Sequence, residues 1–305
     1  MGKPTSPVVD LNAALLVLLL AAVWGGSFFF AEVALRELQP LVITLFRVSL
    51  AVPVLIVVVV LRGVPITRSL RVWRAYLVMG ALNNAIPFSL IFWGQTQIES
   101  GLASILNGTT AMFGALVAGL LLPDEPLRAN KLIGAALGLA GVAFIMGPDA
   151  LQDFNLTNLA QLAILGATLS YAFASVWGKT TLAGQPPLMN ALGMVVCSSA
   201  LMLPIVWFAH GVPSLAFQPA TWGALLGLAV LSTALAYLLY FAILARAGAA
   251  NLMLVTLLIP PFAITLGALF LSERIGTQAL AGFAVIAIGF AVTDGRLFAR
   301  LRQRR

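Results

Sequence analysis

Residues 11–31 form the stretch LNAALLVLLLAAVWGGSFFFA, which contains no charged side chain. A helix needs about 20 apolar residues to cross the hydrocarbon core of a bilayer, so this stretch is long enough to span a membrane. The preceding Lys3 would also fit a signal peptide, but no convincing small-residue cleavage site follows the apolar run. The stretch therefore predicts a retained transmembrane helix.

Nine more apolar stretches of similar length follow, separated by short polar breaks. Turn-forming glycine and proline punctuate these breaks, as in RGVP at residues 62–65 and PDEP at residues 123–126. The predicted spans lie near residues 11–31, 39–61, 72–93, 99–122, 130–147, 157–177, 187–209, 220–245, 249–271 and 277–293.

The composition indicates the same class of protein. Of the 305 residues, 61% are hydrophobic and only 9% are charged, and the mean hydropathy is +1.04. Soluble domains contain about 25% charged residues. A chain so poor in charge has no polar surface to show water, whereas lipid meets the apolar outer face of a membrane protein. We therefore expect an all-α, multi-pass protein of the plasma membrane, the bacterial inner membrane.

Lys and Arg residues are distributed unevenly over the predicted loops. With a cytoplasmic N-terminus, the outside loops contain only Arg36 and Arg274, and Arg47 lies within a span. The other 14 of the 17 basic residues are then on the inside, as the positive-inside rule requires. Ten spans with both termini in the cytoplasm follow. The basic tail at residues 296–305 needs no nucleic-acid partner, because anionic lipid headgroups suffice to attract it.

The second half of the chain matches the first at a nearly constant offset. The matched pairs are Trp24 with Tyr171, Trp93 with Tyr240, Gly101 with Gly248 and Ala103 with Ala250 at an offset of 147, and Glu125 with Glu273, Gly134 with Gly282 and Gly141 with Gly289 at 148.

Five spans in each half bring the second half into the membrane from the opposite side. We therefore expect two inverted five-helix repeats, residues 1–148 and residues 149–305, the second ending in the basic tail. Inverted repeats are typical of secondary transporters, whose substrate site lies near the midplane between the repeats.

Four short motifs accompany this pattern. They are Trp24-Gly25-Gly26-Ser27 late in the first span, Leu45-Phe46-Arg47 in the second, Asp124-Glu125 after the fourth and Ser272-Glu273 after the ninth. With ten spans in two halves, the chain resembles the EamA-type branch of the drug/metabolite transporter (DMT) superfamily. Within that branch it looks closest to the YddG-type exporters of aromatic and other neutral amino acids. The resemblance implies alternating access around a central cavity, walled largely by the third, fourth, eighth and ninth spans.

The chain departs from this resemblance at two positions. Met112 stands where the branch often has proline, although Pro260 and Pro261 match it in the second half. Met194 stands where Arg47 would repeat, so any role of Arg47 is not symmetric.

Polar residues in these four spans are candidates for a cavity lining, because polar groups in hydrocarbon are costly and tend to face the interior of the bundle. Asn83 and Asn84 come just before Pro87, which lacks a backbone donor and leaves a carbonyl free. The alternative is that such residues hold helices together or, for tyrosine, lie in an interfacial belt. The predicted substrate-binding residues are Asn83, Asn84, Phe88, Trp93, Asn107, Thr110, Thr233, Tyr237 and Tyr240.

Trp24, Arg47, Tyr171 and Thr256 fit either the cavity or helix packing. The guanidinium of Arg47 could clamp a carboxylate or phosphate of the substrate. It could instead neutralise the carbonyl ends of neighbouring helices, or pair with Glu32 or Glu99. We favour this structural role, because a long side chain can also extend to the membrane surface.

Two pairs of glycines have GxxxG spacing, Gly134 with Gly138 and Gly223 with Gly227. Close packing of helices within the chain is the default explanation of this spacing, and a homodimer interface is the alternative.

The residues that the chain lacks narrow its function. The single Cys197 and the lone His210 exclude a disulfide framework and the usual metal and catalytic constellations. We expect no enzyme activity, no metal and no cofactor. Apart from Arg47, no ionisable residue lies deep within a span, which disfavours carriers of nucleotides and proton-coupled pumps for lipophilic cations.

The expected function is therefore export of aromatic and other neutral amino acids, or of similar small metabolites. One alternative is export of other neutral metabolites or drugs, such as nucleosides or sugars. A channel, a receptor or a scaffold is another. The expected partners are a small-molecule substrate and membrane lipid.

Overall fold

A computed structural model describes residues 11–146, 156–252 and 255–294. The described residues form helices and contain no strand. Seven helical segments are long and apolar enough to cross a membrane, and three shorter apolar helices accompany them. The seven are Leu11–Leu35, Pro40–Leu61, Leu70–Gln95, Ser100–Leu121, Thr157–Thr181, Pro187–His210 and Pro219–Arg246; the three are Ala129–Ile145, Val255–Leu271 and Thr277–Thr293.

Several of these segments are divided by local changes in helical pairing. In chain order, the elements are α1 (Leu11–Leu35), α2 (Pro40–Leu61), α3 (Leu70–Gly80), η1 (Ala81–Ala85), α4 (Ile86–Gln95), α5 (Ser100–Asn107), α6 (Thr110–Leu121), α7 (Ala129–Met146), α8 (Leu156–Thr181), α9 (Pro187–His210), α10 (Pro219–Leu226), η3 (Gly227–Leu235), α11 (Ala236–Leu252), α12 (Val255–Leu266), η4 (Gly267–Leu271) and α13 (Thr277–Asp294).

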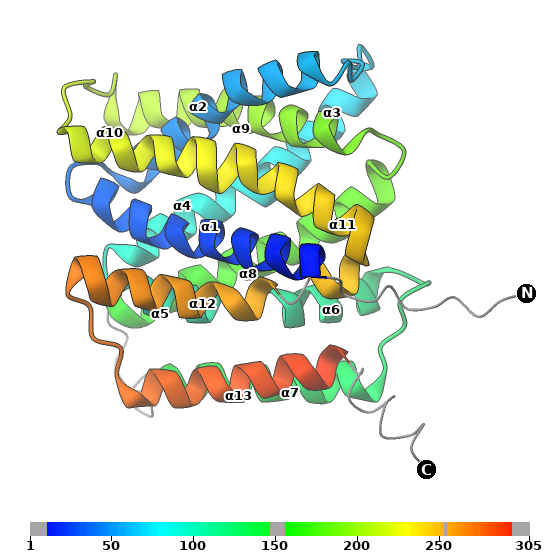
Figure 1. Cartoon of the computed structure of the whole chain (residues 1–305), viewed down its shortest axis with the longest axis vertical. Coiled ribbons are helices and arrows are strands. Elements are labelled where there is room, and N and C mark those ends of the chain that lie inside the picture. The colour runs from blue at the N-terminus through cyan, green and yellow to red at the C-terminus, as the bar shows by residue number, and fades with distance from the viewer. Residues whose placement is uncertain (1–10, 147–155, 253–254, 295–305) are drawn as a thin grey trace, which may run out of the picture.

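The helices lie side by side with their axes roughly aligned, and α7 and α13 form one outer layer (Figure 1). Glycines allow α7 and α13 to approach closely. A Cβ atom added at Gly134 would lie 2.5 Å from the carbonyl oxygen of Gly289, and one at Gly141 would lie 2.8 Å from that of Gly282. The GxxxG prediction is thus confirmed for Gly134, because only glycine permits this contact between backbones.

The other glycines of the two GxxxG pairs differ from one another. Gly138 packs against the side chain of Met112, and Gly227 packs against the ring of Phe30. Gly223 is exposed, and a Cβ atom added there would meet nothing within 4 Å.

Two π-helical segments interrupt the third and eighth spans. The first, η1, comes directly before Pro87, whose ring disturbs the regular pairing of the preceding turn. The second, η3, contains no proline and extends over nine residues. A π-helix shifts backbone pairing by one residue and frees groups for other partners, and such segments often occur at functional sites.

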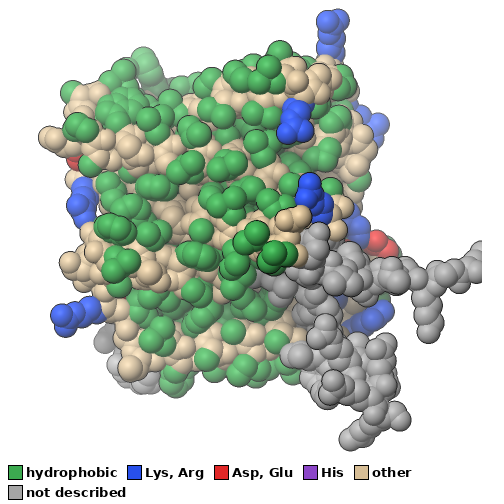
Figure 2. Space-filling view, in the orientation of Figure 1, with side chains coloured by type: hydrophobic (Ala, Val, Ile, Leu, Met, Phe, Trp, Pro, Cys, Tyr) green, Lys and Arg blue, Asp and Glu red, His purple; other side chains and the backbone are tan. Residues whose placement is uncertain are grey.

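The outer surface matches a lipid environment. Large apolar side chains such as Leu61, Phe208 and Leu269 are 80%, 88% and 70% exposed. Figure 2 shows apolar side chains over the middle of one face, with Lys and Arg toward the edges where helices end. Lipid removes the penalty that water would impose on this surface.

The predicted spans agree with the observed helices to within a few residues, except at the boundary between the eighth and ninth. The ninth span was expected at residues 249–271, but α11 continues to Leu252 and α12 begins at Val255. The expected boundary was wrong, because α11 continues through the glycine at position 248. A single glycine lowers helix stability by only about 1 kcal/mol, which packing can offset.

Candidate functional site

Arg47 of α2 is the only charged side chain among the buried residues of the described part of the chain, and it is 6% exposed. Its Nε donates a hydrogen bond to Oγ1 of Thr233 at 3.0 Å, and its Nη2 donates to the carbonyl oxygen of Ser232 at 3.2 Å. Both acceptors belong to η3. The π-helix therefore supplies the carbonyl that receives the guanidinium.

The structural role considered for Arg47 was a contact with helix carbonyls or an ion pair with Glu32 or Glu99. The contact with a helix carbonyl is present. Within the described residues, no ion pair joins Arg47 to Glu32 or Glu99. Of the two structural partners considered, the helix carbonyl is therefore the one that contacts Arg47, and Glu32 accepts instead from Nε2 of Gln95 at 3.4 Å.

Aromatic rings cover the guanidinium of Arg47. Its Cζ atom lies 3.7 Å from the ring centroid of Phe88 and 5.9 Å from that of Phe92. Phe88 and Phe92 are one helical turn apart on α4, so both reach the same side of the cation. The negative face of an aromatic ring attracts a cation, most strongly where water is absent.

Amide and hydroxyl groups form a network beside Arg47. The hydroxyl of Tyr237 donates to Oδ1 of Asn84 at 3.0 Å and accepts from Nδ2 of Asn83 at 3.3 Å. Nδ2 of Asn84 donates to the hydroxyl of Ser198 at 3.1 Å. Three predicted site residues thus meet here, together with a serine of α9. The network joins η1 to α11 and α9 through neutral groups.

Two further tyrosines, Tyr171 and Tyr240, lie near Tyr237, and Tyr240 in turn contacts Trp24. The rings of Trp24 and Tyr240 are 6.1 Å apart, so α1 and α11 contribute to one aromatic wall. Tyr171 of α8 is half-buried and, like Tyr237, interacts electrostatically with Arg47. On the predicted face, Thr233 contacts Arg47 and Tyr237 contacts both asparagines, whereas the ring of Tyr240 packs against Trp24.

The remaining predicted residues are less closely joined. Thr110 is half-buried and donates to the carbonyl oxygen of Asn107 at 2.6 Å. Oδ1 of Asn107 is buried and has no hydrogen-bond partner in the described structure. Thr256 of α12 is half-buried. Trp93 is 37% exposed near the end of α4, so it is not enclosed with the central residues.

Sequence reasoning missed three contributors to this cluster. Ser198 receives the Asn84 amide, Ser232 supplies a carbonyl to Arg47, and Phe92 adds a second ring. Ser198 had a detectable signal, because it is a polar residue within an apolar span. Ser232 had none, because its contribution is a backbone carbonyl within η3.

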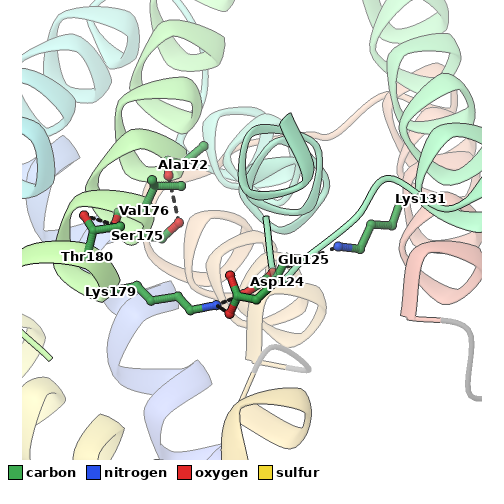
Figure 3. Close-up of polar contacts among 8 residues, drawn as sticks. All are labelled: Asp124, Glu125, Lys131, Ala172, Ser175, Val176, Lys179 and Thr180. Carbon is green, nitrogen blue, oxygen red and sulfur yellow. Dashed lines mark hydrogen bonds and ion pairs between the residues drawn. The ribbon is translucent and has the colours of Figure 1, made fainter. Parts of the chain in front are cut away.

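A separate polar cluster joins the loop after α6 to Lys179 near the end of α8 and to Lys131 near the start of α7 (Figure 3). Nζ of Lys179 points between two carboxylates, 2.6 Å from Oδ2 of Asp124 and 2.7 Å from Oε1 of Glu125. Nζ of Lys131 lies 4.0 Å from Oε2 of Glu125. The hydrogen bond from Lys179 holds the pKa of Asp124 below its ordinary value.

The described residues contain no group of three or more His, Cys, Asp or Glu side chains that could hold a metal ion. The contacts described above make the central cluster one buried cation, neutral amides and hydroxyls, and aromatic rings. Such groups can bind and orient a small molecule.

Comparison with known proteins shows the family of this chain. The model of the EamA-like transporter family matches the chain twice, at residues 11–147 and at residues 158–293, and so covers most of its length. The chain belongs to the EamA-like transporter family. This EamA-like protein is accordingly a membrane transporter.

Individual relatives match nearly the full length of this EamA-like chain. An uncharacterized transporter, YvbV of Bacillus subtilis, is 28% identical over 93% of this chain and 92% of its own. The protein PecM of Dickeya dadantii is 27% identical over 92% of each. A probable amino-acid metabolite efflux pump of Salmonella typhimurium is 27% identical over 91% of this chain and 93% of its own.

The EamA-like fold is also similar to that of a solved crystal structure. The TM-score is 0.68 at 19% identity, over 95% of this chain and 99% of the other. At that identity, the similarity concerns the fold alone.

Proposed function

We propose that this transporter exports amino acids with aromatic or other apolar side chains. The observation that carries the proposal is the amide–tyrosine network of Asn83, Asn84 and Tyr237, which lies beside Arg47. Aromatic rings accompany it, since Phe88 covers the guanidinium and Trp24 packs against Tyr240. Neutral donors and acceptors can hydrogen-bond the polar end of an amino acid, and the rings can pack against an apolar side chain. The name of the Salmonella typhimurium relative, an amino-acid metabolite efflux pump, agrees with this substrate class.

We further infer a mechanism of alternating access between two inverted repeats, residues 1–148 and 149–305, in the plasma membrane. Two adjacent matches to one family model support this division. At the offset of 147 residues, η1 at Ala81–Ala85 corresponds to positions within η3, Gly227–Leu235, so both repeats would have a π-helix at one place. Substrate would bind between the repeats and be released as they rock.

Contacts between the outer helices support the same symmetry. Gly134 and Gly282 are equivalent positions, as are Gly141 and Gly289. The contacts in the structure are Gly134 with Gly289 and Gly141 with Gly282. Two elements related by a two-fold axis contact each other in this reciprocal way.

Efflux from proteoliposomes tests the substrate. Vesicles loaded with radiolabelled phenylalanine, leucine, uridine or glucose should lose the amino acids faster than vesicles without protein. External unlabelled amino acid should accelerate the loss, as expected for a carrier and not for a channel. Asn83→Ala should lower the rate, whereas Gln97→Ala, at an exposed amide outside the cluster, should not.

Release of uridine or glucose alone would overturn the amino-acid proposal. It would favour the alternative, an exporter of other neutral metabolites. A conductance with no saturation would instead identify a channel.

A further inference from the structure

Arg47 has a charge that the described part of the protein does not balance. The three ion pairs found there involve Lys131 or Lys179, and none involves Arg47. Its two hydrogen-bond acceptors, the hydroxyl of Thr233 and the carbonyl of Ser232, are neutral. A buried charge without a counter-ion is costly, and an ionisable residue inside a membrane protein commonly marks a functional site. The buried guanidinium of Arg47 thus has no anion to balance it among the described residues.

The hydrogen bonds also fix which edge of the guanidinium is available. A guanidinium has five N–H groups in a rigid, planar fork. Nε and Nη2, which form its side edge, donate to Thr233 and Ser232. The end edge, formed by Nη1 and the second N–H of Nη2, has no acceptor among the described residues. Two parallel N–H groups of this kind match the two oxygens of a carboxylate.

Attachment of α2 to η3 does not by itself require a charge. At the repeat offset, Met194 of α9 corresponds to Arg47, and η1 corresponds to part of η3. There the contact is made by neutral groups: Nδ2 of Asn83 lies 3.6 Å from Sδ of Met194, and Ser198 accepts from Asn84. One π-helix is thus held without a cation, so the charge at Arg47 calls for another explanation.

We propose that Arg47 binds the carboxylate of the transported molecule, with the end edge of its guanidinium in a bidentate contact. The proposal rests on the proposed export of amino acids and assigns the group that recognises their α-carboxylate. Thr233 and Ser232 hold the fork in place, and Phe88 covers one face of it.

The surrounding groups favour a carboxylate over a phosphate. Arg47 is the only buried cation among the described residues, and the nearby titratable groups are the hydroxyls of Tyr171 and Tyr237. One guanidinium can balance the single charge of a carboxylate, whereas a phosphate dianion calls for several basic groups.

Competition with the wild-type protein is the first test, and it needs no variant. Labelled phenylalanine is the substrate, and 3-phenylpropionate, phenethylamine and phenylalanine amide are the competitors. We expect 3-phenylpropionate, which keeps the carboxylate, to compete at least tenfold more strongly than the other two. Equal competition by the amide and the acid would overturn the proposal.

Variants of Arg47 form the second test. Arg47→Lys and Arg47→Gln should weaken binding of phenylalanine at least tenfold and leave that of phenethylamine nearly unchanged, measured as the ligand-induced rise in melting temperature in detergent. Lysine keeps the charge but lacks the planar fork. Arg62→Gln, at an exposed arginine at the end of the same helix, is the control. It should change the binding of neither phenylalanine nor phenethylamine.

The outcomes separate this proposal from the proposed function. If wild-type vesicles export amino acids but Arg47→Gln loses the binding of phenylalanine and phenethylamine alike, the assignment of Arg47 is wrong and the proposed export stands. If amino acids are not exported but 3-phenylpropionate binds in an Arg47-dependent way, the carboxylate site stands and the amino-acid function fails. If Arg47→Gln does not fold, the wild-type competition still decides.

Discussion

Glu273 accepts hydrogen bonds from both the backbone N–H and the hydroxyl of Ser100, at 2.9 and 2.8 Å. It also accepts from the backbone N–H of Gly101 at 3.2 Å. Ser100 begins α5, and Glu99 is the N-cap residue of that helix. The side chain of Glu99 makes no capping hydrogen bond. A carboxylate from 173 residues further along the chain therefore satisfies the free N–H groups of this helix.

Glu273→Ala should destabilise the protein, because it leaves the first N–H groups of α5 without a carboxylate. Loss of a helix cap costs about 0.5–2 kcal/mol. The melting temperature in detergent should fall, and Ser100→Ala should lower it less, since two of the three bonds survive. Arg274→Ala is the neighbouring control, at an exposed side chain. An equal fall in Glu273→Ala and Arg274→Ala would contradict the role of Glu273 as a cap.

Gly134→Ala should force α7 and α13 apart, because the new Cβ would lie 2.5 Å from the carbonyl oxygen of Gly289. Overpacking of this kind costs about 1–3 kcal/mol. Gly114→Ala is a matched control, since a Cβ there meets nothing within 4 Å and alanine favours the helix by up to about 1 kcal/mol. Thermal melts should show a lower melting temperature for Gly134→Ala than for the wild type. For Gly114→Ala the melting temperature should be unchanged or higher. Indistinguishable melts would mean that the helices separate at no cost.

The spans were largely predictable from the sequence, and their mutual contacts were not. Hydrophobic length determines that residues 40–61 cross a membrane, whatever their neighbours are. The capping of Ser100 by Glu273 depends on how distant segments meet, and no local sequence pattern predicts it. The ninth span was placed too early, because hydropathy is high on both sides of the boundary and does not show where α11 ends and α12 begins.

Tyr237→Phe should disturb the central network, because the lost hydroxyl bridges Asn83 and Asn84. A hydrogen bond of this kind contributes about 1 kcal/mol, and transport affinity should fall several-fold with it. Tyr76→Phe is the control, since the Tyr76 hydroxyl is buried without a partner in the described structure. Its removal should leave efflux unchanged and the melting temperature equal or higher. If both variants transport amino acids as the wild type does, the network lies outside the site.

The candidate site was predictable in its residue types and less so in its geometry. Asn83, Asn84 and Tyr237 were expected to share a cavity because polar residues in hydrocarbon face inward, and they share one network. The acceptors of Arg47 were not foreseen. They depend on η3, a π-helix without a proline to signal it.

Lys179→Gln should have a small effect that depends on pH and salt. The pKa of an Asp carboxyl is ordinarily about 3.9, and the hydrogen bond from Lys179 lowers that of Asp124. Stability from this pair is therefore fully present above pH 4 and is lost as the pH falls through the lowered value. Because the pair is exposed, salt should screen it. Melts of wild type and Lys179→Gln should differ slightly at pH 7 and low salt, and converge at pH 2–3 or in high salt. A difference that persists in acid would contradict this account.

Cysteine labelling should reveal the orientation of the protein, which we infer from its charges. Arg68 precedes α3 and Arg128 precedes α7, and these helices begin at the end of the bundle where α8 ends, which we call the basic end (Figure 1). The helix α9 runs from this end to the opposite one and ends in His210. The positive-inside rule assigns the basic end to the cytoplasm. In a Cys197→Ser background, His210→Cys should react with an impermeant maleimide in intact cells. Arg68→Cys and Arg128→Cys should react only after the membrane is opened. Labelling in the reverse order would invert the topology, and the protein would then release substrate on the other side for the same conformational cycle.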